Sequence, residues 1–288
     1  MTAPAAIRFG YAQLPGIRLH YAAAGEASNP LMLFVHGFPE FWRCWQRQLP
    51  EFGRDHLAVA YDTRGYNLSD KPERLEDYAI EAILGDLKAM VGQFGHKSCI
   101  LVGHDWGGAA CWEFAIQYPE LVEKLVILNA PHPALFRRDL QADPQQQKAS
   151  EYMGFFRTPE AEAKIAADDF AFLWKFTFAG LHRKGQFSDQ DREAYLEAWR
   201  RPGALTGGLN YYRGYRMRKD VLANSRVKVP TLVLWGMRDT ALLPRLIEGL
   251  EDYVPDLRLV RLDEVTHWVT HQASDRVNRE IRAFIGKP

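Results

Sequence analysis

Residues 98–108 read SCILVGHDWGG, and this stretch decides the fold. Its first part, Ser98–Val102, is almost entirely apolar and predicts a buried strand. A tight turn is expected over Gly103–Gly108, with a helix from Trp106 onward. A strand, a sharp turn and a helix in this order form the structural context of a nucleophile elbow, in which one side chain projects from the apex. Asp105 occupies that apex, where a serine is the more usual residue.

An aspartate at this apex changes the chemistry that the turn can perform. Aspartates also cap helices, but the glycines on both sides of Asp105 favour the catalytic interpretation. With an ordinary pKa of about 3.9, a carboxyl group is already an anion at neutral pH and needs no base to attack. Its attack on an sp³ carbon gives an alkyl-enzyme ester, so epoxides and alkyl halides are the expected targets. The chain has no GxSxG motif, which argues against a serine esterase.

The composition argues against two classes of binding partner. The 288 residues hold 36 Lys and Arg and 36 Asp and Glu, so nothing in the net charge favours binding to nucleic acid or to an anionic membrane. The basic run of Arg213, Arg216, Arg218 and Lys219 is therefore interpreted as a solvated face. No window is long and apolar enough for a membrane span, and we expect a cytoplasmic protein.

No metal site or cofactor is expected from the sequence. The three cysteines lie far apart without a CxxC spacing, which favours neither a zinc site nor a disulfide framework. The oligomeric state stays open between a monomer and a homodimer.

Short apolar runs recur along the chain, with helical stretches between them. Near-continuous apolarity predicts strands buried on both faces, as in a parallel sheet covered by helices. A hairpin over 7–12 and 17–21 leads into this sheet. Helices are predicted over 78–94 and 106–118. The strand predictions are 31–35, 57–61, 98–102, 125–128, 231–235 and, nearer an edge, 257–262.

This regularity stops after Pro133 and resumes near Val229. The intervening segment is rich in helix formers and aromatic residues and has no strand-like run. We therefore predict a core in two parts, residues 1–133 and 223–288, with a helical lid inserted over 134–222.

Two further stretches could complete a catalytic site around Asp105. In chains with such an elbow the catalytic groups follow in the order nucleophile, acid, histidine. His267 follows the last predicted strand, which is the position of the histidine that acts as general base. His271 is its nearby rival. Asp239 follows the strand over 231–235, at the sheet edge where sites collect. Two other acids, Asp263 and Glu264, compete with Asp239 because they lie close to His267 in sequence.

The stretch His36-Gly-Phe-Pro-Glu follows the strand over 31–35. We expect the backbone N–H groups of Phe38 and Trp106 to form an oxyanion hole. The side chains of His36, Phe38, Pro39 and Trp106 are expected to line the substrate site.

Taken together, these stretches resemble the α/β-hydrolase-fold epoxide hydrolases. The similar motifs are HGFPEFW (36–42), DTRGYNLSD (62–70), GHDWGG (103–108), NAPHP (129–133) and GGLNYYR (207–213). The resemblance implies an α/β-hydrolase fold in which Asp105 attacks a small apolar epoxide and His267 with Asp239 activates water. It also implies two lid tyrosines that donate hydrogen bonds to the epoxide oxygen. By spacing these would be Tyr195 and Tyr152, while Tyr211 and Tyr212 would pack the lid.

Two alternatives stay open. Haloalkane dehalogenases resemble this chain in placing a tryptophan after the nucleophilic aspartate, as Trp106 does here. Fluoroacetate dehalogenases carry an arginine near the nucleophile, and this sequence has none there. The alternative of another class is a ligand-binding protein that kept the fold and lost its activity. Assays of diol formation and halide release would separate these classes.

Overall fold

A computed structural model describes residues 5–215 and 225–286 of the chain. Within these residues the centre is a sheet of eight strands in the order β1-β2-β4-β3-β5-β6-β7-β8. The strands are β1 (Arg8–Leu14), β2 (Ile17–Ala24), β3 (Leu31–Val35), β4 (Leu57–Tyr61), β5 (Cys99–His104), β6 (Val122–Leu128), β7 (Thr231–Gly236) and β8 (Leu257–Leu262).

The sheet is mostly parallel. β1 and β2 pair antiparallel, as do β2 and β4, while the strands from β4 to β8 run parallel to one another. The parallel strands are apolar along most of their length because helices cover both faces. Alternate residues of β3 show this, since Leu33 and Val35 join the apolar cluster on one face and Phe34 joins the cluster on the other.

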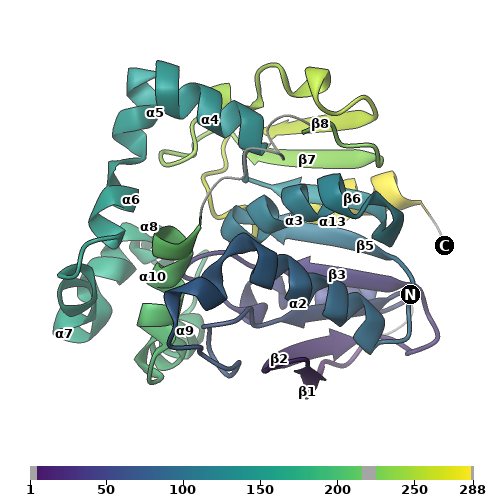
Figure 1. Cartoon of the computed structure of the whole chain (residues 1–288), viewed down its shortest axis with the longest axis horizontal. Coiled ribbons are helices and arrows are strands. Elements are labelled where there is room, and N and C mark those ends of the chain that lie inside the picture. Colours follow the sequence, from purple (N-terminus) through teal and green to yellow (C-terminus); the bar gives the residue numbers. More distant parts are fainter. Residues whose placement is uncertain (1–4, 216–224, 287–288) are drawn as a thin grey trace.

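Two layers of helices enclose the sheet (Figure 1). One layer includes α2 (Ile80–Gln93) and α3 (Asp105–Gln117), and the other includes α1 (Leu49–Phe52) and α13 (Ser274–Ile285). A short helix, α12 (Val269–Gln272), precedes α13. The 3₁₀ helices are η1 (Trp42–Trp45), η2 (Leu75–Tyr78), η3 (Pro119–Leu121), η4 (Pro244–Ile247) and η5 (Leu250–Asp252).

The predicted fold class is confirmed. β3, β4 and β8 have the predicted bounds, and β8 lies at an edge of the sheet as expected. β5 extends further than predicted, through His104, so that the strand leads directly into α3.

The helices that follow β6, which we call the lid helices, gather at one end of the strands (Figure 1). These helices are α4 (Pro133–Ala142), α5 (Pro144–Ala149), α6 (Glu151–Phe156), α7 (Ala161–Phe176), α8 (Ala179–Arg183), α9 (Asp189–Arg200) and α10 (Ala204–Gly214). The predicted end of the lid at residue 222, and with it Arg216, Arg218 and Lys219, lies outside the described residues. Over residues 5–215 and 225–286, no helix combines the length and apolarity that crossing a membrane requires.

Candidate active site

The turn between β5 and α3 presents Asp105 at the end of the sheet. Asp105 has a φ of +50°, in the left-handed region. A non-glycine residue in that conformation costs on the order of 1–3 kcal/mol, and such strain persists only where the surroundings enforce it. Gly107 allows the close contact with β3 that enforces this conformation. A Cβ at Gly107 would lie only 2.3 Å from the carbonyl oxygen of Val35. The tight turn therefore holds the carboxylate out at its apex.

The loop after β3 approaches the same carboxylate. The backbone N–H of Phe38 donates a hydrogen bond to Oδ1 of Asp105 at 2.8 Å. Gly37 makes this approach possible, since a Cβ at that position would lie only 2.2 Å from Asp105 Oδ1. Trp106 follows Asp105 in the first turn of α3, where backbone N–H groups have no partner inside the helix. Of the two N–H groups predicted for the oxyanion hole, that of Phe38 thus contacts the Asp105 carboxylate.

His267 and Asp239 reach this carboxylate from the loops after β8 and β7. His267 Nδ1 lies 2.7 Å from Asp239 Oδ2, and His267 Nε2 lies 3.6 Å from Asp105 Oδ2. The imidazole therefore bridges the two carboxylates, and the structure brings all three predicted residues together. Neither Asp263 nor Glu264 takes the place of Asp239, and His271 lies elsewhere, against Glu40.

Asp239 is held by several donors. Its Oδ1 accepts the backbone N–H groups of Ala241 and Leu242, each at 2.9 Å. Its Oδ2 accepts a hydrogen bond from Asn129 Nδ2 at 2.7 Å. Asn129 is fixed in turn, because its Oδ1 accepts the N–H of Gly236 at 2.7 Å. We did not predict Asn129 from the sequence, although its place directly after β6, beside β7, was the available signal.

The charges around His267 shift the pKa values of the pair. Burial opposes the charged form of His267, but Asp239 and Asp105 outweigh it and raise the pKa of the imidazole to about 10. Burial likewise opposes the charged form of Asp239, yet the contact with His267 holds the pKa of that carboxyl below its ordinary value. At neutral pH the free protein therefore carries a protonated His267 between two carboxylates.

Two cavities meet at Asp105. The first, which we call the Trp106 cavity, has a volume of about 590 Å³, and Phe136, Leu140 and Leu242 contribute to its apolar wall. The second, which we call the His267 cavity, has a volume of about 360 Å³ and is more polar. The residues that line both cavities are Asp105, Tyr152 and Tyr212.

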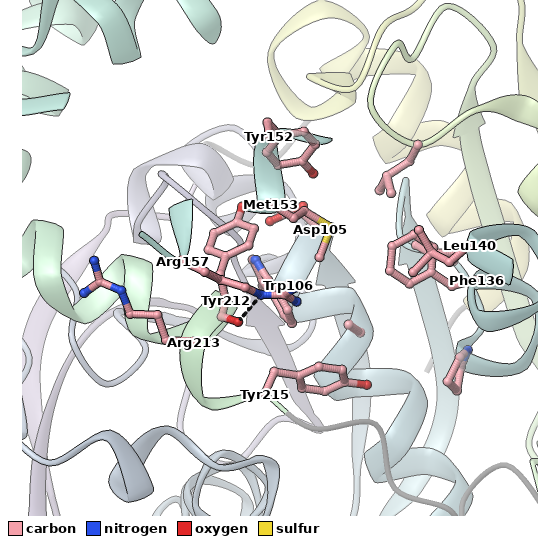
Figure 2. A pocket seen from close by; sticks show the side chains of 14 residues that line it. Asp105, Trp106, Phe136, Leu140, Tyr152, Met153, Arg157, Tyr212, Arg213 and Tyr215 are labelled. Carbon is pink, nitrogen blue, oxygen red and sulfur yellow. Dashed lines mark hydrogen bonds between the residues drawn. The ribbon is translucent and has the colours of Figure 1, made fainter. Parts of the chain in front are cut away.

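Tyr152 from α6 and Tyr212 from α10 have their hydroxyl ends turned toward Asp105 (Figure 2). Their ring centroids lie 6.2 Å apart. Burial raises the pKa of both phenols, and the negative charge of Asp105 raises both further. The two hydroxyl groups thus stay protonated and can donate hydrogen bonds beside the carboxylate.

The position of Tyr195 contradicts the sequence prediction. This side chain is fully buried, lines neither cavity and directs its hydroxyl to Oε1 of Glu40 at 3.1 Å. Tyr212 takes the place beside Asp105 that we had expected for Tyr195. The neighbouring Tyr211 does pack the lid against the core, because its hydroxyl donates to the carbonyl oxygen of Arg64 at 3.2 Å.

The structure also corrects the expectation for His36. Its side chain lines neither cavity, because Nε2 accepts the backbone N–H of Thr63 at 3.0 Å and the residue is 1% exposed. His36 fixes the loop that carries Phe38. Phe38 and Pro39 line the His267 cavity, and Trp106 lines the Trp106 cavity.

Comparisons with known proteins identify the family of this chain. Residues 30–273 match the model of the α/β-hydrolase fold family. Epoxide hydrolase 4 of Mus musculus is 40% identical over 277 residues, which cover 94% of this chain and 77% of the relative. Epoxide hydrolase 1 of Caenorhabditis elegans is 37% identical, with 96% of this chain and 70% of the relative covered.

A solved structure is similar over nearly the whole length. The epoxide hydrolase of Bacillus megaterium, crystallised with an inhibitor, superposes with a TM-score of 0.90 at 37% identity. The match covers 96% of this chain and 99% of that one. The chain therefore belongs to the α/β-hydrolase fold family, and within it to the epoxide hydrolases.

Proposed function

We propose that this protein hydrolyses a small apolar epoxide to a vicinal diol through a covalent ester on Asp105. One observation carries the mechanism: Asp105, Tyr152 and Tyr212 line the same two cavities, with both hydroxyls turned toward the carboxylate (Figure 2). The Asp105 carboxylate is the nucleophile. The two phenols act as acids toward the epoxide oxygen, which leaves the attacked carbon but stays bonded to the other carbon of the ring. The apolar wall of the Trp106 cavity suits the body of such a substrate.

The first step is opening of the epoxide ring. One oxygen of Asp105 attacks an epoxide carbon, the carbon–oxygen bond breaks and negative charge develops on the departing oxygen. Tyr152 and Tyr212 donate hydrogen bonds to that oxygen, and preorganised donors of this kind stabilise a developing alkoxide in a site that excludes water. The alkoxide takes up one proton, which balances the proton that His267 then gives up, and the product is a hydroxyalkyl ester of Asp105.

The second step is hydrolysis of that ester by water. Ester formation removes the negative charge of Asp105, one of the two charges that raise the pKa of His267. The pKa of His267 therefore falls, and the imidazole loses its proton and becomes a base. It can then take a proton from the attacking water while Asp239 holds its Nδ1–H.

Water attacks the carbonyl carbon of the ester, and the resulting oxyanion needs hydrogen-bond donors. The N–H of Phe38 already donates to Asp105 Oδ1, and we assign the second donor to the N–H of Trp106. Losing one such donor typically costs about 3 kcal/mol of transition-state stabilisation. Collapse of the tetrahedral intermediate releases the diol and regenerates the carboxylate.

A side-by-side turnover assay tests this function. Diol formation from styrene oxide and a panel of epoxides would be followed next to halide release from bromoalkanes and from fluoroacetate. We expect diol without halide. Halide without diol would keep Asp105 as nucleophile but exclude the epoxide proposal, and no turnover in either assay would favour a binding protein.

A further inference from the structure

The outer surface of the lid carries a cluster of aromatic rings that takes no part in the steps above. Phe172 and Phe176 lie four residues apart on α7, on the side of the lid away from the sheet (Figure 1). Their rings stack with centroids 6.1 Å apart, yet the residues are 40% and 45% exposed. Phe155 of α6 packs against Phe172, with 5.7 Å between ring centroids. Single exposed apolar residues are ordinary, but a contiguous exposed cluster indicates an interaction surface.

Positively charged side chains accompany these rings. Lys175 belongs to the same side of α7, Arg183 ends α8, and Lys184 follows it directly. Residues 170–187 contain these three cations and no Asp or Glu. The net charge of the chain predicts no membrane binding, because it averages this local excess with acidic side chains elsewhere.

The neighbouring carboxylates do not neutralise this charge. Glu162 of α7 pairs with Arg213 at 2.7 Å. Asp169 of α7 pairs with Arg200 at 2.6 Å. What we call the α7 surface consists of Phe155, Lys164, Phe172, Lys175, Phe176, Arg183 and Lys184. Among the residues that the structure describes, its four cations take part in no ion pair.

The α7 surface continues into the active site. Four of its members also line the His267 cavity, namely Lys175, Phe176, Arg183 and Lys184. All four are exposed, so they mark the place where this cavity opens to the outside. Inside the opening, the ring of Phe176 packs against that of Tyr152 with 5.5 Å between centroids.

We propose that the α7 surface docks the protein onto an anionic lipid bilayer, with Phe172 and Phe176 inserted between the headgroups. Exposed aromatic rings beside cations are typical of protein surfaces that lie in the membrane interface. The cations attract the anionic headgroups, while the phenyl rings bury their exposed area at the acyl boundary. The His267 cavity then opens toward the lipid. Docking rests on the surface alone, and only its use for the uptake of an apolar epoxide rests on the proposed function.

The charge of the α7 surface favours lipid over a second copy of the chain. In a symmetric dimer the same surface of both subunits meets at the interface. Such a dimer would place the four cations of one subunit against the four cations of the other, and like charges that face each other repel. An anionic bilayer instead presents the opposite charge to all four cations.

Co-sedimentation with sucrose-loaded vesicles tests the proposal without any turnover. We expect the protein to bind vesicles of POPC and POPG mixed at about two to one, in low salt. Binding to POPC alone should be at least about ten-fold weaker, and about 0.5 M NaCl should release the protein from POPG vesicles. Wild-type protein that stays in the supernatant with POPG vesicles would overturn the proposal.

A first variant removes the exposed ring that lines neither cavity. Phe172→Ser should weaken binding to POPG vesicles by about five-fold or more, because the variant has no phenyl area to bury in the bilayer. The matched control is Phe9→Ser, since Phe9 is 59% exposed on β1 at the far edge of the sheet. The control should bind like the wild type, and the Tm of both variants should show that they fold.

A second variant removes charge and keeps the rings. It combines Lys175→Gln, Arg183→Gln and Lys184→Gln. Each cation near anionic lipid contributes about five-fold, so binding should weaken by about 10²-fold. The matched control neutralises three exposed cations of the core, Lys97→Gln, Lys228→Gln and Arg279→Gln, and should change little.

Either variant can overturn the inference. Wild-type binding strength in Phe172→Ser or in the triple variant would show that the α7 surface does not contact the lipid. A dimer in sedimentation velocity that Phe172→Ser dissociates would assign this surface to a second copy instead. None of these measurements involves an epoxide, so failure of docking and failure of the proposed function are separate results.

Discussion

Two clusters in this molecule are built from the same kinds of side chain and differ in what surrounds them. Around Asp105 lie a histidine and two tyrosines, and around Glu40 lie two histidines and one tyrosine. The first cluster opens to two cavities, whereas Glu40 has no exposed surface. Every oxygen of Glu40 already faces a protein donor, while the Asp105 carboxylate lines both cavities.

The comparison shows why residue types alone do not identify a reactive site. His267 Nε2 lies 3.6 Å from the nearer Asp105 oxygen, while the Glu40 contacts with its two histidines measure 2.6 and 2.9 Å. The longer contact leaves one Asp105 oxygen able to react in the proposed mechanism, whereas the shorter contacts enclose both oxygens of Glu40.

The strongest way to break this comparison is to remove the nucleophile. Asp105→Ala should lower diol formation by at least about 10⁴-fold, because Asp239, the other carboxylate at these cavities, is engaged by His267, Asn129 and two backbone N–H groups. Steady-state turnover of styrene oxide measures the effect, with the Tm as a check that the variant folds. Turnover near the wild-type rate would exclude Asp105 as the nucleophile.

The next largest effect should come from the base. His267→Gln should still form the ester but release diol about 10³-fold more slowly, because no base activates the water. Intact-mass spectra should show the protein plus one epoxide. The matched control is His182→Gln, a lid histidine whose Nε2 pairs with Asp189 at 2.8 Å, and it should accumulate no adduct. A His267→Gln protein without adduct would contradict the two-step mechanism.

The three lid tyrosines sharpen the comparison further. Tyr152→Phe and Tyr212→Phe should each slow ring opening by about 10²-fold, since each removes a donor to the developing alkoxide. Tyr195→Phe should change the same rate by less than about three-fold, because its hydroxyl faces Glu40. Pre-steady-state ester formation measures all three. A larger loss in Tyr195→Phe than in Tyr212→Phe would reverse the assignment.

The smallest effect is a change in the pKa of His267. This pKa is raised to about 10, so the protonated imidazole stabilises the fold fully below about pH 6.5, and the stabilisation is lost as the pH rises through 10. Asp105→Asn removes one of the two neighbouring charges and should lower the pKa by about 1 to 3. NMR titration of ¹⁵N-labelled histidine measures it. An unchanged value would show that Asp105 does not control the charge of His267.

Much of the fold could be predicted from the sequence because buried parallel strands leave a plain signal. β3 and β4 are apolar throughout and have the predicted bounds. The elbow was equally visible, because only small residues fit where Gly107 meets the carbonyl oxygen of Val35. The order of nucleophile, acid and histidine along the chain then placed Asp239 and His267 at the same sheet edge.

The choice of tyrosines could not be predicted because it depends on how the lid helices are rotated. Tyr211 and Tyr212 are adjacent in sequence but lie about 100° apart around α10. One therefore faces Arg64 and the other faces Asp105. Spacing along the chain carries no information on that rotation, which tertiary packing decides. The prediction for Tyr195 was wrong for the same reason. The hydrogen-bond partner of its hydroxyl, Glu40, lies 155 residues away in the sequence.

The two oxygens of Asp105 are not equivalent, and an isotope experiment would record the difference. Oδ1 is held by the N–H of Phe38, so Oδ2 is the atom free to bond to the substrate. In the proposed mechanism that oxygen leaves in the diol, and solvent supplies its replacement in the protein. A first turnover in H₂¹⁸O would release unlabelled diol and mark the aspartate instead. The enzyme would carry an atomic trace of each reaction into the next one.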